Sequence, residues 1–167
     1  QAYLTTRGIG PAEAGRFRLG LVTSPLAGHE SYGGRLVIPY LDPVGVVTLR
    51  FRCLRNHVCK DEGCPKYLGI AGAEARLYNV LDFRKPGQAI YICEGEIDTL
   101  TLSLCGFPAI GTPGVSQWKK HFTRCFADYI DGGQIFCVAD GDDAGYKMGR
   151  FLAAEVKARI LRPPKGE

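Results

Sequence analysis

Two short acidic motifs contain the residues of this chain best suited to chemistry. The first, Glu94–Asp98, reads EGEID, and the second, Asp140–Asp143, reads DGDD. Carboxylates that gather in one place repel one another unless a hard cation compensates them, and ligation by oxygen alone favours Mg²⁺ or Mn²⁺. A divalent ion held in this way usually serves phosphate chemistry, where it bridges phosphate oxygens and orients an attacking hydroxyl.

The elements expected around these motifs would bring the carboxylates together. Each motif follows an apolar run that reads as a buried strand, and three such strands alternate with helical stretches, which predicts a parallel sheet with right-handed crossovers. Open α/β sheets bind ligands at the carboxyl ends of their strands, so Glu94, Asp140 and Asp142 are expected to converge there. Asp98 lies about one helical turn after Glu94 and is expected on the same side. The expected strands are 89–93, 108–111 and 134–139, and the expected helices are 95–105, 116–126 and 144–159.

A simpler interpretation of the acidic motifs is that they stabilise helix N-termini, where negative charge is mildly favourable. This interpretation accounts well for Asp142, Asp143 and Asp98. It accounts less well for Glu94 and Asp140, because each ends a buried strand and precedes a glycine, which leaves room for a ligand near the backbone. The spacing favours metal binding, and both interpretations remain open at this stage.

A second group of chemically capable residues lies in a polar segment, 53–72, that is expected to be a loop. Cys53, His57, Cys59 and Cys64 place three thiols and one imidazole within twelve residues. A tetrahedral structural Zn²⁺ requires four nitrogen and sulfur donors. A metal ion bound in this way also stabilises the fold of a short loop. The spacing lacks a paired C-x2-C, so the alternative is a set of reduced surface thiols beside a chance histidine.

The first half of the chain is basic and the second half is neutral. Residues 1–70 hold nine Lys and Arg against five Asp and Glu, whereas residues 71–167 hold twelve of each. This division suggests that the first half meets a polyanion, although a solvated surface that happens to be basic explains it as well. The elements expected there are a helix at 11–17 and an antiparallel hairpin of strands 35–40 and 46–52.

Composition restricts the class of protein. The 167 residues are 46% hydrophobic and 23% charged, which suits a compact unit of one or two subdomains and excludes a disordered tail, a fibre or a large multidomain enzyme. No apolar run approaches the roughly 18 residues of a membrane span, and the start lacks a signal pattern, so we expect a soluble protein without a membrane partner. Seven cysteines without an export signal favour free thiols or metal ligands in a reducing cytoplasm. Three of them are expected in the apolar core, namely Cys93, Cys105 and Cys137.

The acidic motifs resemble those of a known family. YICEGEID at 91–98, followed some forty residues later by ADGDDAG at 139–145, is similar to the TOPRIM domain of DnaG-type primases and of type IA and II topoisomerases. Ordered upstream segments resemble the DnaG-type RNA polymerase domain and favour a compact, phage-type primase. These segments are Thr6–Ile9, Phe17–Gly20, Arg35–Tyr40, Phe51–Arg52 and Pro65–Leu68.

The resemblance implies an α/β fold in two parts. Residues 1–86 would form a basic, mixed α+β subdomain with antiparallel strands, which contains the Cys/His loop at 53–64. Residues 87–167 would form a TOPRIM-like parallel βαβαβα domain with its boundary at Pro86-Gly87. We expect this domain to be truncated at its C-terminal end, because the family's later acidic pair would begin about where this sequence stops. We likewise expect this sequence to lack the zinc-binding module that the family carries upstream.

The resemblance also assigns roles to individual residues. It implies that Glu94 acts as an acid/base or metal ligand and that Asp140 and Asp142 bind the divalent metal, Mg²⁺ or Mn²⁺. Asp98, which its spacing places on the same side, is expected to join this catalytic set. Arg52, Lys66 and Tyr67 match positions that contact template, primer or nucleotide phosphates. Basic side chains suit phosphates and a tyrosine can stack on a base, although a solvated basic loop with a half-buried aromatic explains them equally simply. Gly69-Ile70 replaces the family's Asn-Ser, which puts a contact from that asparagine in doubt.

The function implied is that of a DNA primase catalytic core in a bacterial or phage-infected cytoplasm. Its partners would be single-stranded DNA template, ribonucleoside triphosphates, the RNA primer and a replicative helicase. Two alternatives remain open. One is a TOPRIM nuclease or topoisomerase-like enzyme, and the other is a non-catalytic module that binds single-stranded DNA.

Overall fold

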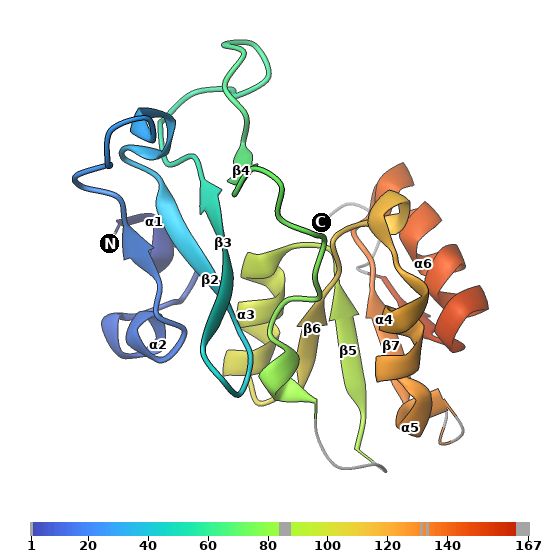
Figure 1. The fold of residues 1–167 in the computed structure, drawn as a ribbon. Coiled ribbons are helices and arrows are strands. Elements are labelled where there is room, and N and C mark those ends of the chain that lie inside the picture. Colours follow the sequence, from blue (N-terminus) through green and yellow to red (C-terminus); the bar gives the residue numbers. More distant parts are fainter. Residues whose placement is uncertain (1, 84–87, 131, 133, 163–167) are drawn as a thin grey trace. The chain divides into compact units, whose positions relative to one another are not determined.

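The structure is a computed structural model that describes residues 2–83, 88–130, 132 and 134–162 (Figure 1). The chain divides into two compact units, Gln1–Glu74 and Ala75–Glu167. The boundary expected at Pro86-Gly87 lies outside the described residues. No helix in the described part of the chain is long and apolar enough to span a membrane.

The first unit is built on a four-stranded antiparallel sheet in the order β1-β2-β3-β4. The expected hairpin is present as β2 and β3, and Asp42 shapes its turn because its Oδ1 accepts hydrogen bonds from the backbone N–H groups of Val44 and Gly45 at 2.8 and 2.9 Å. Leu36, Ile38 and Phe51 are buried on this sheet. The elements are α1 (Ala2–Thr5), α2 (Pro11–Arg16), β1 (Gly20–Leu21), the 3₁₀ turn η1 (Glu30–Tyr32), β2 (Leu36–Leu41), β3 (Val46–Arg52) and β4 (Tyr67–Gly69).

Strand β4 corrects the expectation of an irregular loop over 53–72. Tyr67 pairs with Arg52, and Gly69 pairs with Arg50, in an antiparallel ladder. The strand has only three residues and its partner lies some fifteen residues earlier, so it has no local periodicity that a sequence pattern could reveal. The pairing brings together the two ends of the 53–66 connection.

The second unit holds the expected parallel sheet, with four strands in the order β6-β5-β7-β8. Helix α3 packs on β5 and β6, and α6 packs on β7 and β8 (Figure 1). Strands β5 and β7 are the two inner strands, and their alternate apolar side chains fill the core together with Leu152 and Val156 of α6. The elements are η2 (Val80–Asp82), β5 (Ile90–Cys93), α3 (Glu96–Leu104), β6 (Ala109–Gly111), η3 (Val115–Gln117), α4 (Lys120–Cys125), α5 (Ala127–Ile130), β7 (Ile135–Val138), α6 (Asp143–Val156) and β8 (Arg159–Leu161).

Three expectations for this unit were wrong in detail. Helix α6 ends at Val156 rather than 159, because Lys157 adopts a left-handed conformation with φ 55° and the chain turns into a fourth strand, β8. The helix expected over 116–126 is a 3₁₀ turn followed by α4, separated by the extended backbone of Trp118. Cys105, expected in the core, is exposed at the end of α3, whereas Cys93 and Cys137 are buried as expected.

Candidate functional site

The two acidic motifs meet at one edge of the parallel sheet. Strands β5 and β7 are adjacent and parallel, and Cys93 pairs with Val138 at their carboxyl ends. Glu94 follows one strand directly, and Asp140 follows the other after one residue. Burial raises the pKa of Glu94 above its ordinary value, and the negative charges of Asp140, Asp142 and Asp98 raise it further. The structure therefore brings all four predicted carboxylates into one electrostatic neighbourhood.

Two glycines in and beside the acidic motifs, Gly95 and Gly145, approach neighbouring groups closely. A Cβ on Gly95 would lie 2.6 Å from Oδ2 of Asp98, so the Asp98 carboxylate is folded back over the beginning of α3. A Cβ on Gly145 would lie 2.4 Å from the carbonyl oxygen and 2.6 Å from the nitrogen of Asp140. Helix α6 thus rests directly on the Asp140 backbone, and only glycine permits that approach.

Asp142 also has the structural role that the simpler interpretation gave it. It is the N-cap of α6, and its Oδ1 accepts a hydrogen bond of 2.9 Å from the Gly145 backbone N–H. Asp143 is exposed in the first turn of α6, as a charge that stabilises the helix N-terminus would be. A capping carboxylate still has a second oxygen that can bind a cation, so capping and metal binding are compatible at Asp142.

The thiols beneath the acidic edge are poor metal ligands. Burial raises the pKa of Cys93 to about 12, with a further contribution from the charge of Asp98. Burial likewise raises the pKa of Cys137 to about 11, with a contribution from Glu94. Both thiols stay protonated at neutral pH, so oxygen atoms are the donors that this edge offers to a cation. That donor set fits Mg²⁺ or Mn²⁺, which prefer oxygen.

The four residues of the Cys/His motif come together in the first unit. Their candidate ligand atoms all lie within 4.8 Å of one another. Nε2 of His57 lies 3.4 Å from Sγ of Cys53 and 3.3 Å from Sγ of Cys59, and Sγ of Cys64 lies 3.6 Å from Sγ of Cys53. The structure thus shows four soft donors around a common point, in one connection between two paired strands.

Two further residues support this cluster, and the sequence reasoning missed both. Nδ1 of His57 lies 2.7 Å from Oε2 of Glu62, and this hydrogen bond raises the pKa of His57. Arg35 is 8% exposed and donates from Nη1 to the carbonyl of Pro65 at 2.8 Å and from Nη2 to Sγ of Cys64 at 3.4 Å. Glu62 could have been suspected from its place in the motif loop, whereas nothing in the sequence connects Arg35 to residues about 30 positions later.

Burial and hydrogen bonding shift the pKa of the Cys53 thiol in opposite directions. Burial raises its pKa, but the backbone N–H of Arg55 and the side chains of Cys64, His57 and Cys59 lower the pKa to about 7. A thiol with a pKa near neutrality is readily present as the thiolate, which is the form that binds metal.

The predicted nucleic-acid residues fall on and beside strands β3 and β4. Arg52 donates a hydrogen bond from Nη1 to the hydroxyl of Tyr67, and its guanidinium lies 5.1 Å from the centre of the Tyr67 ring and 4.8 Å from that of Tyr3. Arg50, which the sequence reasoning did not select, lies 5.2 Å from the Tyr67 ring centre. Lys66 is exposed, and its carbonyl accepts a hydrogen bond from the Cys53 backbone. The result is a basic and aromatic cluster.

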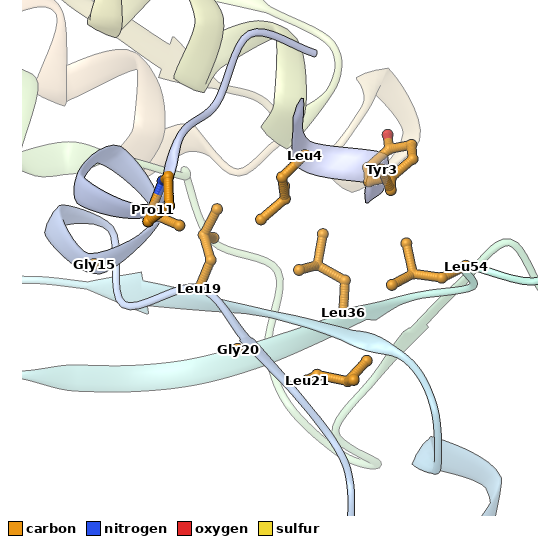
Figure 2. Close-up of a pocket in the computed structure, with 10 residues that line it drawn as sticks. Tyr3, Leu4, Pro11, Gly15, Leu19, Gly20, Leu21, Leu36 and Leu54 are labelled. Carbon is orange, nitrogen blue, oxygen red and sulfur yellow. The ribbon is translucent and has the colours of Figure 1, made fainter. Parts of the chain in front are cut away.

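A separate pocket in the first unit has a volume of about 390 Å³ and a largely apolar lining. Figure 2 shows Leu4, Leu19, Leu36 and Leu54 projecting into it, beside Tyr3. Its lining residues include no carboxylate, imidazole or thiol, so the pocket has none of the groups on which metal or acid/base chemistry depends.

A parallel sheet with Glu-Gly at the end of one inner strand and Asp-Gly-Asp at the end of the next defines the class of this protein as Toprim-like. Residues 91–166 match the family described as Toprim-like. The chain is 37% identical over 142 residues to the Gene 57 protein of Mycobacterium phage D29, and the match covers 81% of this chain and 88% of the phage protein. The chain belongs to this family.

Solved structures show that the fold of DnaG primase cores extends over the first unit as well. The chain is similar to the DnaG catalytic core with a TM-score of 0.66 at 21% identity. It is also similar to the RNA polymerase domain of Mycobacterium tuberculosis primase DnaG, solved in complex with double-stranded DNA, with a TM-score of 0.71 at 20% identity. Both matches cover 99% of this chain but only 64% and 65% of the solved chains. The fold expected from the resemblance is confirmed.

Proposed function

We propose that this chain is the catalytic core of a DNA primase, which joins ribonucleotides on a single-stranded DNA template. One observation carries the proposal. Four carboxylates meet at the carboxyl edge of β5 and β7, in a chain that shares the fold of DnaG cores over nearly its whole length. The partners would be the template, ribonucleoside triphosphates, the RNA primer and a replicative helicase, in the cytoplasm of a bacterium or phage-infected host.

The carboxylates would divide the chemistry among them. Glu94, Asp140 and Asp142 would hold Mg²⁺ or Mn²⁺, which supplies charge neutralisation for the triphosphate. Alternatively, Glu94 would act as the acid/base that receives the proton of the primer 3′-hydroxyl, with Asp140 and Asp142 holding the cation. Asp98, held over Gly95, adds negative charge that strengthens the site's attraction for cations.

The basic and aromatic cluster would hold nucleic acid. Arg50, Arg52 and Lys66 supply positive charge for phosphates, and Tyr67 supplies a ring for stacking. Nε of Arg52 is buried and lacks a hydrogen-bond partner within the described residues, so the protein does not fully satisfy the hydrogen-bonding groups of this guanidinium. The first unit would thus bind nucleic acid and the second would hold the catalytic cation. A template-directed polymerase needs both functions.

Nucleotide incorporation on primed and unprimed single-stranded templates, with Mg²⁺ or Mn²⁺, tests the proposal. Asp140→Asn should reduce incorporation on the order of 100-fold or more, the size typical of losing one group that stabilises transition-state charge. Asp128→Asn is the matched control, because Asp128 is an exposed acid in α5, and it should retain wild-type activity.

The two alternatives predict different results in the same assay. Equal incorporation by wild type and Asp140→Asn would refute the catalytic assignment. Metal-dependent cleavage of the template without incorporation would indicate a Toprim nuclease. Binding of single-stranded DNA with no incorporation under either metal would indicate a non-catalytic binding module.

A further inference from the structure

We propose a structural zinc site that fixes the connection between β3 and β4. Its four ligands are Cys53, His57, Cys59 and Cys64. Zn–S bonds of about 2.3 Å and Zn–N bonds of about 2.0 Å place the ligands of a tetrahedral zinc about 3.5 to 3.8 Å apart. The separations of 3.4 and 3.3 Å between Nε2 of His57 and the sulfur atoms of Cys53 and Cys59, and of 3.6 Å between the sulfur atoms of Cys53 and Cys64, lie close to those values. Four donors around one point complete the ligand set, as in structural rather than catalytic zinc sites.

Glu62 provides independent support for metal ligation by His57. Histidines that bind zinc through one ring nitrogen usually donate a hydrogen bond from the other nitrogen to a carboxylate or carbonyl. Nε2 of His57 faces the thiols of Cys53 and Cys59, and Nδ1 lies 2.7 Å from the carboxylate of Glu62. The imidazole is therefore oriented as a zinc ligand with its supporting acid in place.

The thiols are not arranged as a disulfide framework. Sγ atoms of Cys53 and Cys64 are 3.6 Å apart, far beyond the S–S bond length of about 2.05 Å. A disulfide between any two of the three cysteines would also leave the third thiol and the histidine without a common partner. A single zinc ion satisfies all four donors at once.

The position of the cluster indicates what the zinc does. Cys53 directly follows Arg52, the last residue of β3, and Cys64 lies three residues before Tyr67, the first residue of β4. The segment between them has no regular strand or helix in the structure. Zinc would join its two ends, and Arg35 would secure the far end through the Pro65 carbonyl and Cys64. The zinc site would thus keep Tyr67 paired with Arg52.

Metal analysis of the full chain, purified under reducing conditions without added chelator, tests the site. We expect about one zinc per chain in wild type and in Cys125→Ser, which removes an exposed thiol at the end of α4. Cys59→Ser should lose most of that zinc. Glu62→Gln should retain the fold and weaken zinc affinity by about 10- to 100-fold in competition with a chromophoric chelator.

Cobalt exchange provides a readout that does not depend on how the variants fold. Co²⁺ bound to wild type should show thiolate-to-cobalt charge transfer and the intense visible bands of a tetrahedral complex. The proposal is overturned if wild type contains no zinc and gives no such spectrum, if Cys59→Ser retains full zinc, or if mass analysis finds a disulfide among the three cysteines.

A consequence for nucleic-acid binding rests on the proposed function. Removing zinc should weaken single-stranded DNA binding by the wild type, because Tyr67 loses its fixed place beside Arg52. If zinc is found but its removal leaves DNA binding unchanged, the zinc site stands and the assignment of Arg52 and Tyr67 to nucleic acid fails. The two proposals can therefore fail separately.

Discussion

Asp140 and Gly145 are packed so closely that a Cβ on Gly145 would lie 2.4 Å from the Asp140 carbonyl oxygen. The contact joins the end of β7 to the first turns of α6 across a loop that contains the rest of the acidic motif. The same helix turn supplies the N–H that Asp142 caps. The positions of Asp140 and Asp142 therefore depend on a glycine that carries no chemistry of its own.

Gly145→Ala should destabilise the second unit, because the added methyl must push α6 away from Asp140. Overpacking of this kind typically costs about 1 to 3 kcal/mol, and a backbone neighbour cannot rotate aside. Urea unfolding measures the loss. Gly15→Ala in α2 is the control, since a Cβ there meets no atom within 4 Å, and it should leave stability unchanged or slightly higher. Equal effects of the two substitutions would contradict this account of the motif.

Two substitutions of Asp142 separate its capping role from its role with metal. Asn still offers an oxygen to the Gly145 N–H, so Asp142→Asn should retain stability but bind Mn²⁺ more weakly. Ala removes the cap as well, and Asp142→Ala should lose about a further 1 kcal/mol of stability. Urea unfolding and Mn²⁺ titration by electron paramagnetic resonance provide the two readouts. Unchanged Mn²⁺ affinity in Asp142→Asn would leave only the capping role.

Glu94 should make the metal-free protein less stable as the pH rises above about 4.5, which is the ordinary pKa of a glutamate side chain. Its pKa is raised in the folded state, so between the ordinary and the raised value the folded state binds more protons than the unfolded state, and stability falls with rising pH. Glu94→Gln should remove this fall and be more stable than wild type at pH 7. Unfolding curves at several pH values measure the difference. Added Mg²⁺ should reduce the stability difference between Glu94→Gln and wild type. A Glu94→Gln variant that is less stable than wild type at pH 7 would refute the prediction.

Arg52 and Tyr67 should affect binding of single-stranded DNA in different ways. Arg52→Gln should lower affinity and reduce the salt dependence by about 0.7 in the slope of log K against log salt, the value for one phosphate contact on a single strand. Tyr67→Ala should cost about 1 to 3 kcal/mol through lost stacking, with little change in that slope. Fluorescence anisotropy at several salt concentrations measures both. Arg159→Gln, an exposed arginine on β8, is the control and should match wild type.

Arg35→Met should destabilise the first unit, because the buried guanidinium bonds to the carbonyls of Ser31 and Pro65 and to the thiol of Cys64. Hydrogen bonds from charged groups contribute about 1.5 to 3 kcal/mol, so we expect a loss on the order of 3 kcal/mol. Arg55→Met is the control. It removes an exposed arginine of the connection between β3 and β4, which Arg35 contacts, and should change stability little. Thermal unfolding compares the two, and similar midpoints would show that Arg35 does not anchor the loop.

The groups that could act chemically were readable from local sequence. Residues of fixed type at fixed spacing, such as EGEID, DGDD and the four Cys/His positions, indicated carboxylate and soft-ligand sites, and apolar runs before the acids indicated the parallel sheet. These signals are local because strand, turn and helix propensities act over a few residues. The acidic motifs indicated a TOPRIM domain, and the ordered upstream segments such as Arg35–Tyr40 and Pro65–Leu68 indicated the fold of DnaG-type primase cores.

Only the tertiary structure decided how distant residues meet. The pairing of β4 with β3, the addition of β8 beyond α6 and the approach of Arg35 to Cys64 all depend on contacts between segments separated in sequence. Short strands such as Tyr67–Gly69 are stable only through their partners, so their own residues carry no periodic signal. The sequence alone determined which groups could act, and long-range packing determined which of them lie within reach of one another.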